Sequence, residues 1–233
     1  MSLLVIDTSG SRAVVATAPT AGGPATVHLG RPGTSVGADL TLLIGAAVST
    51  LPDGLAGVRA VGVGTGPGSF TGLRVGLAAA KTIAWSLGCP LAGIPGPDAL
   101  RRALGERLGP DAARCAILRP AGLRDRYLSL PGADPILLPP GSDLVAAVGD
   151  HPAAVLDLPA EEWAGLAGLA GADPAGLGRI AEAGLADALL ALLAERIAAG
   201  RTDDPAVLEP AYVAQPRGVA PGEGRDRWSP ELR

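Results

Sequence analysis

The sequence predicts an α/β protein with two halves, each built on a mixed β-sheet that has helices on its faces. The first observation is the order of elements in the N-terminal half, where three closely spaced strand-like runs precede alternating helices and strands. The second is a weaker repeat of the same order after Gly109 and Pro110. The third is composition: of 233 residues, 48% are hydrophobic and 18% are charged, which is typical of a globular chain.

The N-terminal half begins with three β-rich runs separated by turn residues, and this close spacing predicts an antiparallel meander. An apolar stripe with helical period follows, and after it come a buried strand, a long helix, another strand and another helix. The expected strands are 3–7, 12–18, 25–29, 60–66 and 90–95, and the expected helices are 39–51, 71–87 and 97–108.

In the C-terminal half, the runs RCAILRP and RDRYLSL flank a glycine-containing loop and predict a β-hairpin. Further expected elements are strands at 135–139 and 153–158, a short helix at 142–149, and one long Ala/Leu helix at 174–199.

The predicted halves are residues 1–109 and 110–216. Residues 217–233 are polar and rich in Gly and Pro, so we expect a disordered tail there.

The net charge of −4 and the lack of a Lys/Arg block argue against an independent nucleic-acid binder. The opening MSLLVIDTSG is unlike a signal peptide, and no apolar run reaches the roughly 18 residues of a membrane span. We expect a cytoplasmic protein that does not bind membranes.

The most distinctive stretch is the glycine loop GTGPGSFTGLR at 64–74. It does not match the Walker loop, the dinucleotide-binding glycine pattern or the nucleophile elbow. Two interpretations stay open: an anion site at the N-terminus of the following helix, or a tight strand-to-helix turn capped by Ser69 or Thr71. The loop motif consists of Gly66, Pro67, Gly68, Ser69, Phe70, Thr71, Gly72 and Arg74.

The helix after the loop carries a ridge of small residues, Gly72, Gly76, Ala80 and Ala84, at a spacing of four. Small ridges let a second helix approach closely. Both this helix and the 39–51 helix are poor in charge, so they need more cover than one sheet provides. The ridge is either internal to one domain or an interface with another subunit. The expected interface residues are Leu40, Leu43, Ala47, Gly72, Leu73, Gly76, Ala80 and Ala84.

Catalytic residues are scarce. The two histidines, His28 and His151, form no metal-binding pair, and we expect no metal site. Asp7, followed by Thr8 and Ser9, lies at the end of the first strand, where mixed α/β folds hold ligands. The second half has Arg119 and Pro120 where a matching acid and glycine would stand.

Three stretches carry a resemblance to a known family: VIDTSG at 5–10, GTGPGSFTGLRVGLAAAKTIAWSLGCPLAGIPGPDAL at 64–100, and LEPAYV at 208–213. They resemble the bacterial TsaB family, also called YeaZ, whose members are accessory subunits for threonylcarbamoyladenosine modification of tRNA. The string GPGSFTGLR is highly specific. The likeness is strong over residues 1–100 and faint beyond.

The resemblance implies an actin-like ATPase (ASKHA) fold of two RNase H-like halves, with a vestigial nucleotide cleft at Asp7, Thr8 and Ser9. It implies a non-catalytic subunit whose N-terminal half pairs with TsaD, the catalytic paralogue. TsaD carries the metal and modifies the adenosine beside the anticodon of tRNAs that read codons starting with A. The ATPase TsaE joins the complex, tRNA is contacted only through the complex, and the subunit alone forms a homodimer. It implies that no cofactor is bound tightly, and it makes ADP or ATP a candidate ligand at the partner interface.

Two stretches depart from the family pattern. GTSVGADL replaces a His-Ser pair before the 39–51 helix, and ILRPAGLRDRYLSL keeps little of an Asp-Ala-Arg hairpin. Our first hypothesis is a scaffold that activates a tRNA-modifying partner. The alternative is an autonomous actin-fold enzyme, either a small-molecule kinase or a glycoprotease-like peptidase. A homodimer unrelated to tRNA is a third hypothesis.

Overall fold

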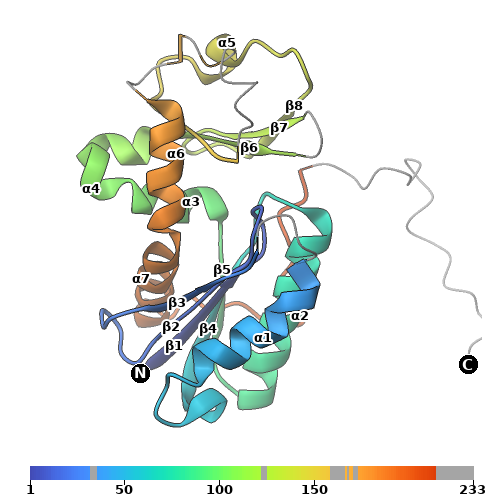
Figure 1. The fold of residues 1–233 in the computed structure, drawn as a ribbon, viewed down its shortest axis with the longest axis vertical. Coiled ribbons are helices and arrows are strands. Elements are labelled where there is room, and N and C mark those ends of the chain that lie inside the picture. The colour runs from blue at the N-terminus through green and yellow to red at the C-terminus, as the bar shows by residue number, and fades with distance from the viewer. Residues whose placement is uncertain (32–35, 122–124, 158–165, 167, 170–172, 214–233) are drawn as a thin grey trace, which may run out of the picture.

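The computed structural model describes residues 1–31, 36–121, 125–157, 166, 168–169 and 173–213. Within these residues, each half of the chain contains one mixed β-sheet, and helices lie between and around the two sheets (Figure 1). The predicted α/β class with two mixed-sheet halves is therefore confirmed.

The first sheet has the strand order β3-β2-β1-β4-β5. β1, β2 and β3 pair antiparallel, as the predicted meander requires, and β4 and β5 join in parallel. β1 and β4 are buried nearly throughout, as expected for central strands with helices on both faces. The strands are β1 (Ser2–Asp7), β2 (Val14–Ala18), β3 (Thr26–Leu29), β4 (Val58–Gly64) and β5 (Leu91–Ile94).

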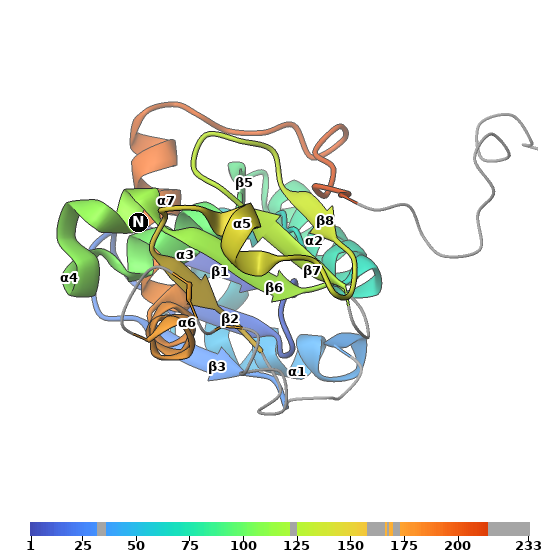
Figure 2. The ribbon, with the colours of Figure 1, turned by 90° about the horizontal axis from the view of Figure 1, so that it is seen from above.

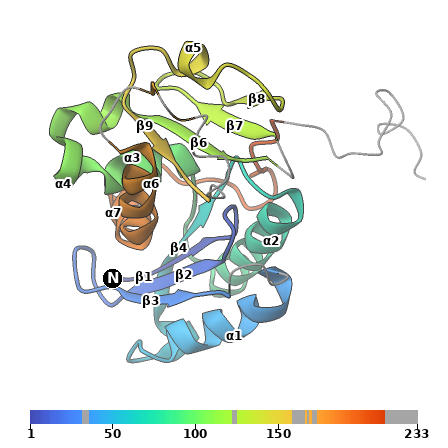
Figure 3. The same ribbon diagram turned by 45° about the horizontal axis from the view of Figure 1, so that its top comes forward.

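Helices α1 and α2 lie side by side on one face of this sheet (Figures 1 and 3). α2 ends at Gly88, whose φ of 60° is the left-handed conformation typical of a helix C-cap. The helices of this part of the chain are α1 (Val36–Val48), η1 (Gly54–Gly57), α2 (Phe70–Leu87), α3 (Gly96–Ala103), α4 (Gly105–Leu108) and η2 (Gly109–Arg114).

The second sheet repeats the pattern with the order β8-β7-β6-β9. β6, β7 and β8 are antiparallel, and β9 is parallel to β6. Its elements are β6 (Ala116–Pro120), β7 (Arg126–Ser129), β8 (Ile136–Leu138), α5 (Leu144–Val148) and β9 (Ala153–Val155).

The prediction of one helix over 174–199 is wrong at Gly184, which separates α6 (Pro174–Ala183) from α7 (Leu185–Ala198). The backbone of Gly184 passes close to α3, since a Cβ there would lie 3.0 Å from the Cβ of Ala103. The break lets α6 pack on β9 while α7 covers the face of the first sheet opposite α1 and α2. The expected helix over 97–108 is likewise divided, at Leu104.

Residues 201–213, the C-terminal strap, return to the first sheet and cover its β5 edge. The N–H of Asp203 donates to the carbonyl of Leu91 (2.8 Å), and the N–H of Ala211 donates to the carbonyl of Thr65 (2.8 Å). Figure 2 shows the strap, in orange and red, leaving α7 and crossing to the side of α2. An edge strand covered in this way offers fewer free backbone groups to other chains.

One hydrophobic core contains residues of both sheets together with α3, α6 and α7, so the halves share buried surface. The boundary at residues 109 and 110 stays a prediction, and the expected tail at 217–233 lies outside the described residues. Of the helices in the described ranges, none has both the length and the apolar character needed to cross a bilayer.

Candidate functional site

The turn after β1 holds the three residues of the predicted vestigial cleft, and Asp7, Thr8 and Ser9 are all buried. Ser9 donates to Oδ1 of Asp7 from its backbone N–H (2.7 Å) and from its hydroxyl (2.6 Å). The hydroxyl of Thr8 donates to the carbonyl of Gly72 at the start of α2 (2.7 Å). Oδ2 of Asp7 is buried and has no hydrogen-bond partner within the described part of the chain.

The glycine loop wraps around this turn. The N–H of Ser69 donates to the carbonyl of Ser9 (3.2 Å), and the hydroxyl of Ser69 accepts from the N–H of Gly72 (3.2 Å). Ser69 is therefore the N-cap of α2, which decides between the two caps that the sequence left open. Gly66 has a φ of 94°, in the region that favours glycine.

The remaining glycines of the loop and helix let the two segments approach closely. A Cβ at Gly68 would collide with the carbonyl oxygen of Ser9. A Cβ at Gly72 or Gly76 would collide with Thr8. Close packing of α2 on the β1 turn therefore accounts for these glycines.

Arg119, on β6 of the second half, closes the space beside this turn. It is 5% exposed, and its Nη1 donates to the hydroxyl of Ser9 (2.9 Å) and to the carbonyl of Pro67 (3.3 Å). Its Nη2 lies 3.0 Å from where a Cβ on Gly10 would be. The sequence identified Arg119 only as a replacement for an acid, whereas the structure gives it the role of a buried cation that joins the halves.

A second polar contact joins the halves at Asp157. Ser11 donates to the Asp157 carboxylate from its hydroxyl (2.6 Å) and its backbone N–H (3.3 Å). Glu182 of α6 lies close to Asp157, and burial, reinforced by the negative charge of Asp157, raises the pKa of Glu182 to about 6. Arg119 and Arg12 partly oppose this shift. The sequence did not point to Asp157 or Glu182, because their proximity depends on how α6 docks on β9.

An actin-like fold would hold nucleotide phosphates and a metal ion between its halves. In the described residues, the guanidinium of Arg119 lies in this region and already donates to Ser9 and Pro67. The Asp157–Glu182 pair adds negative charge, which opposes binding of a phosphate. Within the described ranges, no group of three or more His, Cys, Asp and Glu residues is placed to hold a metal ion.

The expected interface residues require a correction. Leu43 is half-buried, and the other seven are buried inside their own chain: Leu40, Ala47, Gly72, Leu73, Gly76, Ala80 and Ala84. The small-residue ridge packs against β4 and the β1 turn, so its interpretation as an interface with another subunit is wrong. The physical reason is that α2 crosses the end of β1 at short range, which only small residues allow.

A different set of residues forms the outer surface of the two helices. Leu42 is 73% exposed and Trp85 is 79% exposed, and three small residues of the same two helices are also exposed. We call this set the outer helical surface: Leu42, Gly45, Ala46, Ala78 and Trp85. Large apolar side chains exposed on neighbouring helices are typical of a protein-binding surface.

Two further residues of the loop motif, Phe70 and Arg74, meet the C-terminal strap. The guanidinium carbon of Arg74 lies 3.8 Å from the centre of the Phe70 ring. Nε of Arg74 donates to the hydroxyl of Tyr212 (2.8 Å), whose ring centre lies 5.3 Å from that of Phe70. LEPAYV and the glycine loop are separate motifs in the sequence, and the structure brings them together.

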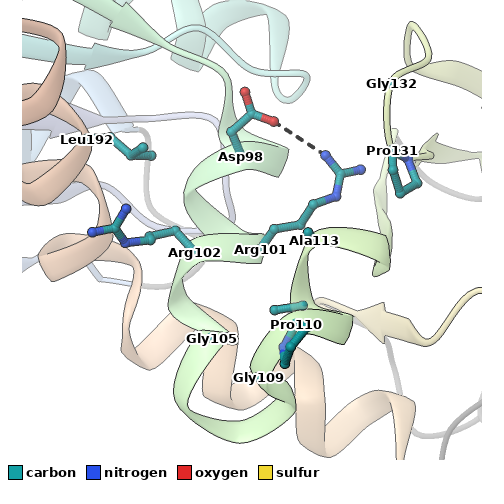
Figure 4. A pocket seen from close by; sticks show the side chains of 11 residues that line it. Asp98, Arg101, Arg102, Gly105, Gly109, Pro110, Ala113, Pro131, Gly132 and Leu192 are labelled. Atoms are coloured by element: carbon teal, nitrogen blue, oxygen red, sulfur yellow. Dashed lines mark hydrogen bonds and ion pairs between the residues drawn. The ribbon is translucent and has the colours of Figure 1, made fainter. Parts of the chain in front are cut away.

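A cavity of about 490 Å³ lies away from these residues, between α3, η2 and the turn after β7 (Figure 4). Both arginines that line the cavity form hydrogen bonds or ion pairs with other elements of the fold. Arg101 donates to the carbonyls of Cys115 (2.8 Å) and Ser129 (2.7 Å), and Arg102 pairs with Glu195 (2.8 Å). Its other lining residues are mostly Gly, Pro and Ala, so this cavity has the character of a structural gap between elements.

Two mixed sheets, with helices on both faces of the first sheet, define a protein of the mixed α/β class. Among solved structures, this is the fold of YeaZ. YeaZ from Pseudomonas aeruginosa matches with a TM-score of 0.64 and 21% identity over 91% of this chain and 100% of that chain. A protein described as similar to peptidase YEAZ from Pseudomonas aeruginosa matches with a TM-score of 0.64 and 20% identity, over 91% and 99%.

Sequence comparisons give two further matches. The family model described as TsaD, tRNA N6-adenosine threonylcarbamoyltransferase, matches residues 39–109, a segment that includes the glycine loop and α2. Uncharacterized protein ML0378 of Mycobacterium leprae (strain TN) is 39% identical over 103 residues. That match covers 43% of this chain and 29% of the relative, so the chain spans less than a third of the relative's length.

Proposed function

We propose that this protein is a TsaB-type accessory subunit that binds a TsaD-like threonylcarbamoyltransferase through α1 and α2 and supports its modification of tRNA. The YeaZ fold and the TsaD family match over 39–109 support a place in threonylcarbamoyladenosine formation. The observation that carries the proposal is the outer helical surface, with Leu42 73% exposed and Trp85 79% exposed.

The chemistry of this surface favours a protein partner. Asp39 is the one ionised residue among the α1 side chains that the structure describes, and α2 has Arg74 and Lys81. Few charged residues therefore lie on the exposed faces of two adjacent helices. A partner that packs helices here would bury Leu42 and Trp85, and large buried side chains carry most of the binding energy in protein interfaces.

The polar contacts between the halves support an accessory role over catalysis. Arg119 lies in the region where an actin-fold enzyme would hold phosphates, and the acidic pair at Asp157 and Glu182 disfavours an anion. The peptidase alternative lacks support in the placed histidines, since His28 lies on β3 and His151 contacts the carbonyl of Arg114 (2.9 Å). We therefore assign the chemistry to the partner.

The rest of the assembly follows from the same proposal. The modified base is the adenosine beside the anticodon of tRNAs that read codons starting with A. A TsaE-like ATPase joins the complex in the cytoplasm, and tRNA is contacted only through the complex. ADP or ATP, where it takes part, lies at the partner interface. Without its partner, the subunit forms a homodimer through α1 and α2.

The test measures binding of the purified protein to the TsaD-like paralogue of its host by light scattering and titration calorimetry. Leu42→Glu should weaken binding at least about tenfold, which corresponds to about 1.4 kcal/mol. Val207→Glu is the matched control, because Val207 is a 71% exposed apolar residue on the strap. A strain lacking the protein should have less of the modified base, and Val207→Glu should restore it better than Leu42→Glu. ATP turnover by the protein alone would favour the enzyme alternative.

A further inference from the structure

Arg74 is held in place by two of the few aromatic residues of this chain. The sequence has one phenylalanine and two tyrosines, and Phe70 and Tyr212 both contact this arginine. Phe70 and Arg74 are four residues apart on α2, so they share a helix face, whereas Tyr212 is 138 positions from Arg74 along the chain. The FTGLR part of the loop motif thus encodes a stacked arginine in the first turns of α2.

The stack orients the guanidinium through the ring of Phe70 and the hydroxyl of Tyr212. No carboxylate of the described ranges lies within ion-pair distance of Arg74, whose side chain is exposed. Nε donates to Tyr212, and within the described ranges the four Nη hydrogens have no acceptor, so they can serve another one. The first turn of α2 has no acidic residue. A cation near a helix N-terminus is unfavourable for the helix, so helix stability does not explain Arg74.

We propose that Arg74 is a pre-oriented recognition residue that pairs with a carboxylate of the partner protein docked on the outer helical surface. This inference rests on the proposed function and adds the chemistry of one contact to it. Arg74 lies on α2, the helix that also carries Ala78 and Trp85 of that surface. A planar guanidinium with its Nη groups free matches a carboxylate through two parallel hydrogen bonds.

The charge distribution favours a protein carboxylate over the phosphates of tRNA. The chain has a net charge of −4, and α2 offers two cations, Arg74 and Lys81, seven residues apart. Nucleic-acid binding surfaces combine several cations in a stripe. A single stacked arginine beside apolar residues is instead typical of the energetically dominant contacts in protein interfaces.

The experiment measures affinity for the TsaD-like paralogue without tRNA or nucleotide, across a series of salt concentrations. Arg74→Met keeps an unbranched stem against Phe70 and removes the charge, and it should weaken binding at least tenfold and flatten the salt dependence. Arg74→Lys should recover only part of the affinity, since it lacks the two-pronged geometry. Lys81→Met, the matched loss of charge on the same helix, should change the affinity less than threefold. Arg74→Glu should be rescued by reversing the charge of one acidic residue of the paralogue.

Each other outcome overturns the proposal in a distinguishable way. If Arg74→Met binds as tightly as the native protein while Leu42→Glu does not bind, the partner docks on the outer helical surface without Arg74. Arg74 then serves only to hold the C-terminal strap. If Arg74→Met weakens the complex only after tRNA is added, the acceptor is a phosphate. If the native protein does not bind the paralogue at all, the proposed function and this contact fail together. Hydrogen exchange of residues 201–213 in Arg74→Met reports whether the strap stays in place.

Discussion

The guanidinium of Arg119 donates a 2.9 Å hydrogen bond to the hydroxyl of Ser9, although the two residues are 110 positions apart and belong to different halves of the chain. Through Ser9, the guanidinium is linked to the buried carboxylate of Asp7. The bond joins the two halves, and it ties the second sheet to the turn on which the glycine loop and α2 rest.

Replacing Arg119 should loosen this junction. Arg119→Met removes the donor to Ser9 and Pro67, and we expect the free energy of unfolding to fall by about 2–3 kcal/mol, since hydrogen bonds to charged groups are worth about that much. Urea denaturation measures the difference. Arg179→Met is the control, because Arg179 is 64% exposed and pairs with Asp173 at 3.6 Å; its effect should stay within about 0.5 kcal/mol. Equal stability of the two variants would contradict the role of Arg119.

Two glycines on neighbouring helices should respond oppositely to the same change. A Cβ at Gly76 meets Thr8, so Gly76→Ala should lower the free energy of unfolding by about 1–3 kcal/mol through overpacking. A Cβ at Gly45 meets nothing within 4 Å, so Gly45→Ala should raise it by about 0.5–1 kcal/mol through helix propensity. Thermal unfolding of the two variants and of the native protein measures both changes in stability. Stabilisation by Gly76→Ala would mean that the ridge is not an internal contact.

The acidic pair between the halves predicts a pH dependence of stability. Burial and Asp157 raise the pKa of Glu182 from its ordinary 4.5 to about 6, so the folded protein holds this proton more tightly than the unfolded chain. The contribution of Glu182 to stability should therefore fall as the pH rises from about 4.5 to about 6 and stay constant above. Glu182→Gln should flatten that part of the profile and raise the melting temperature at pH 7.5.

The same experiment on Glu106→Gln provides the control, since Glu106 is an exposed residue of α4. Its profile between pH 4.5 and pH 7.5 should follow that of the native protein. If the stability profile of Glu182→Gln also follows that of the native protein, the Asp157–Glu182 pair does not contribute to the pH dependence of stability.

The strap should detach when its acidic anchor is removed. Oδ2 of Asp203 accepts from the N–H of Gly93 (2.8 Å) and from Nη2 of Arg196 (3.1 Å). Asp203→Ala leaves both donors unpaired and should cost about 1–3 kcal/mol. Amide exchange in β5 and in residues 201–213 should accelerate, whereas Asp134→Ala, at an exposed position, should leave it unchanged. Unaltered protection of β5 in Asp203→Ala would mean that the strap does not depend on this anchor.

The sequence by itself determined the strands of both sheets and the order in which strands and helices follow one another. The alternation of Gly- and Pro-rich turns with apolar runs placed every strand of the first sheet, and the spacing predicted which strands form the meander. Ser69 was among the two predicted caps of α2, because capping depends on residues within one turn. The weaker repeat in the second half was also readable, since it follows the same local rules.

Tertiary structure decided what those elements face. The spacing of Gly72, Gly76, Ala80 and Ala84 showed a smooth ridge, yet a ridge that meets Thr8 and one that meets a foreign helix have the same pattern. The approach of Arg119 to Ser9, of Glu182 to Asp157 and of Tyr212 to Arg74 joins residues far apart in the chain. Periodicity records only that a face is apolar or small, because it depends on neighbours along one helix. Which surface covers that face depends on how both sheets pack around a shared core.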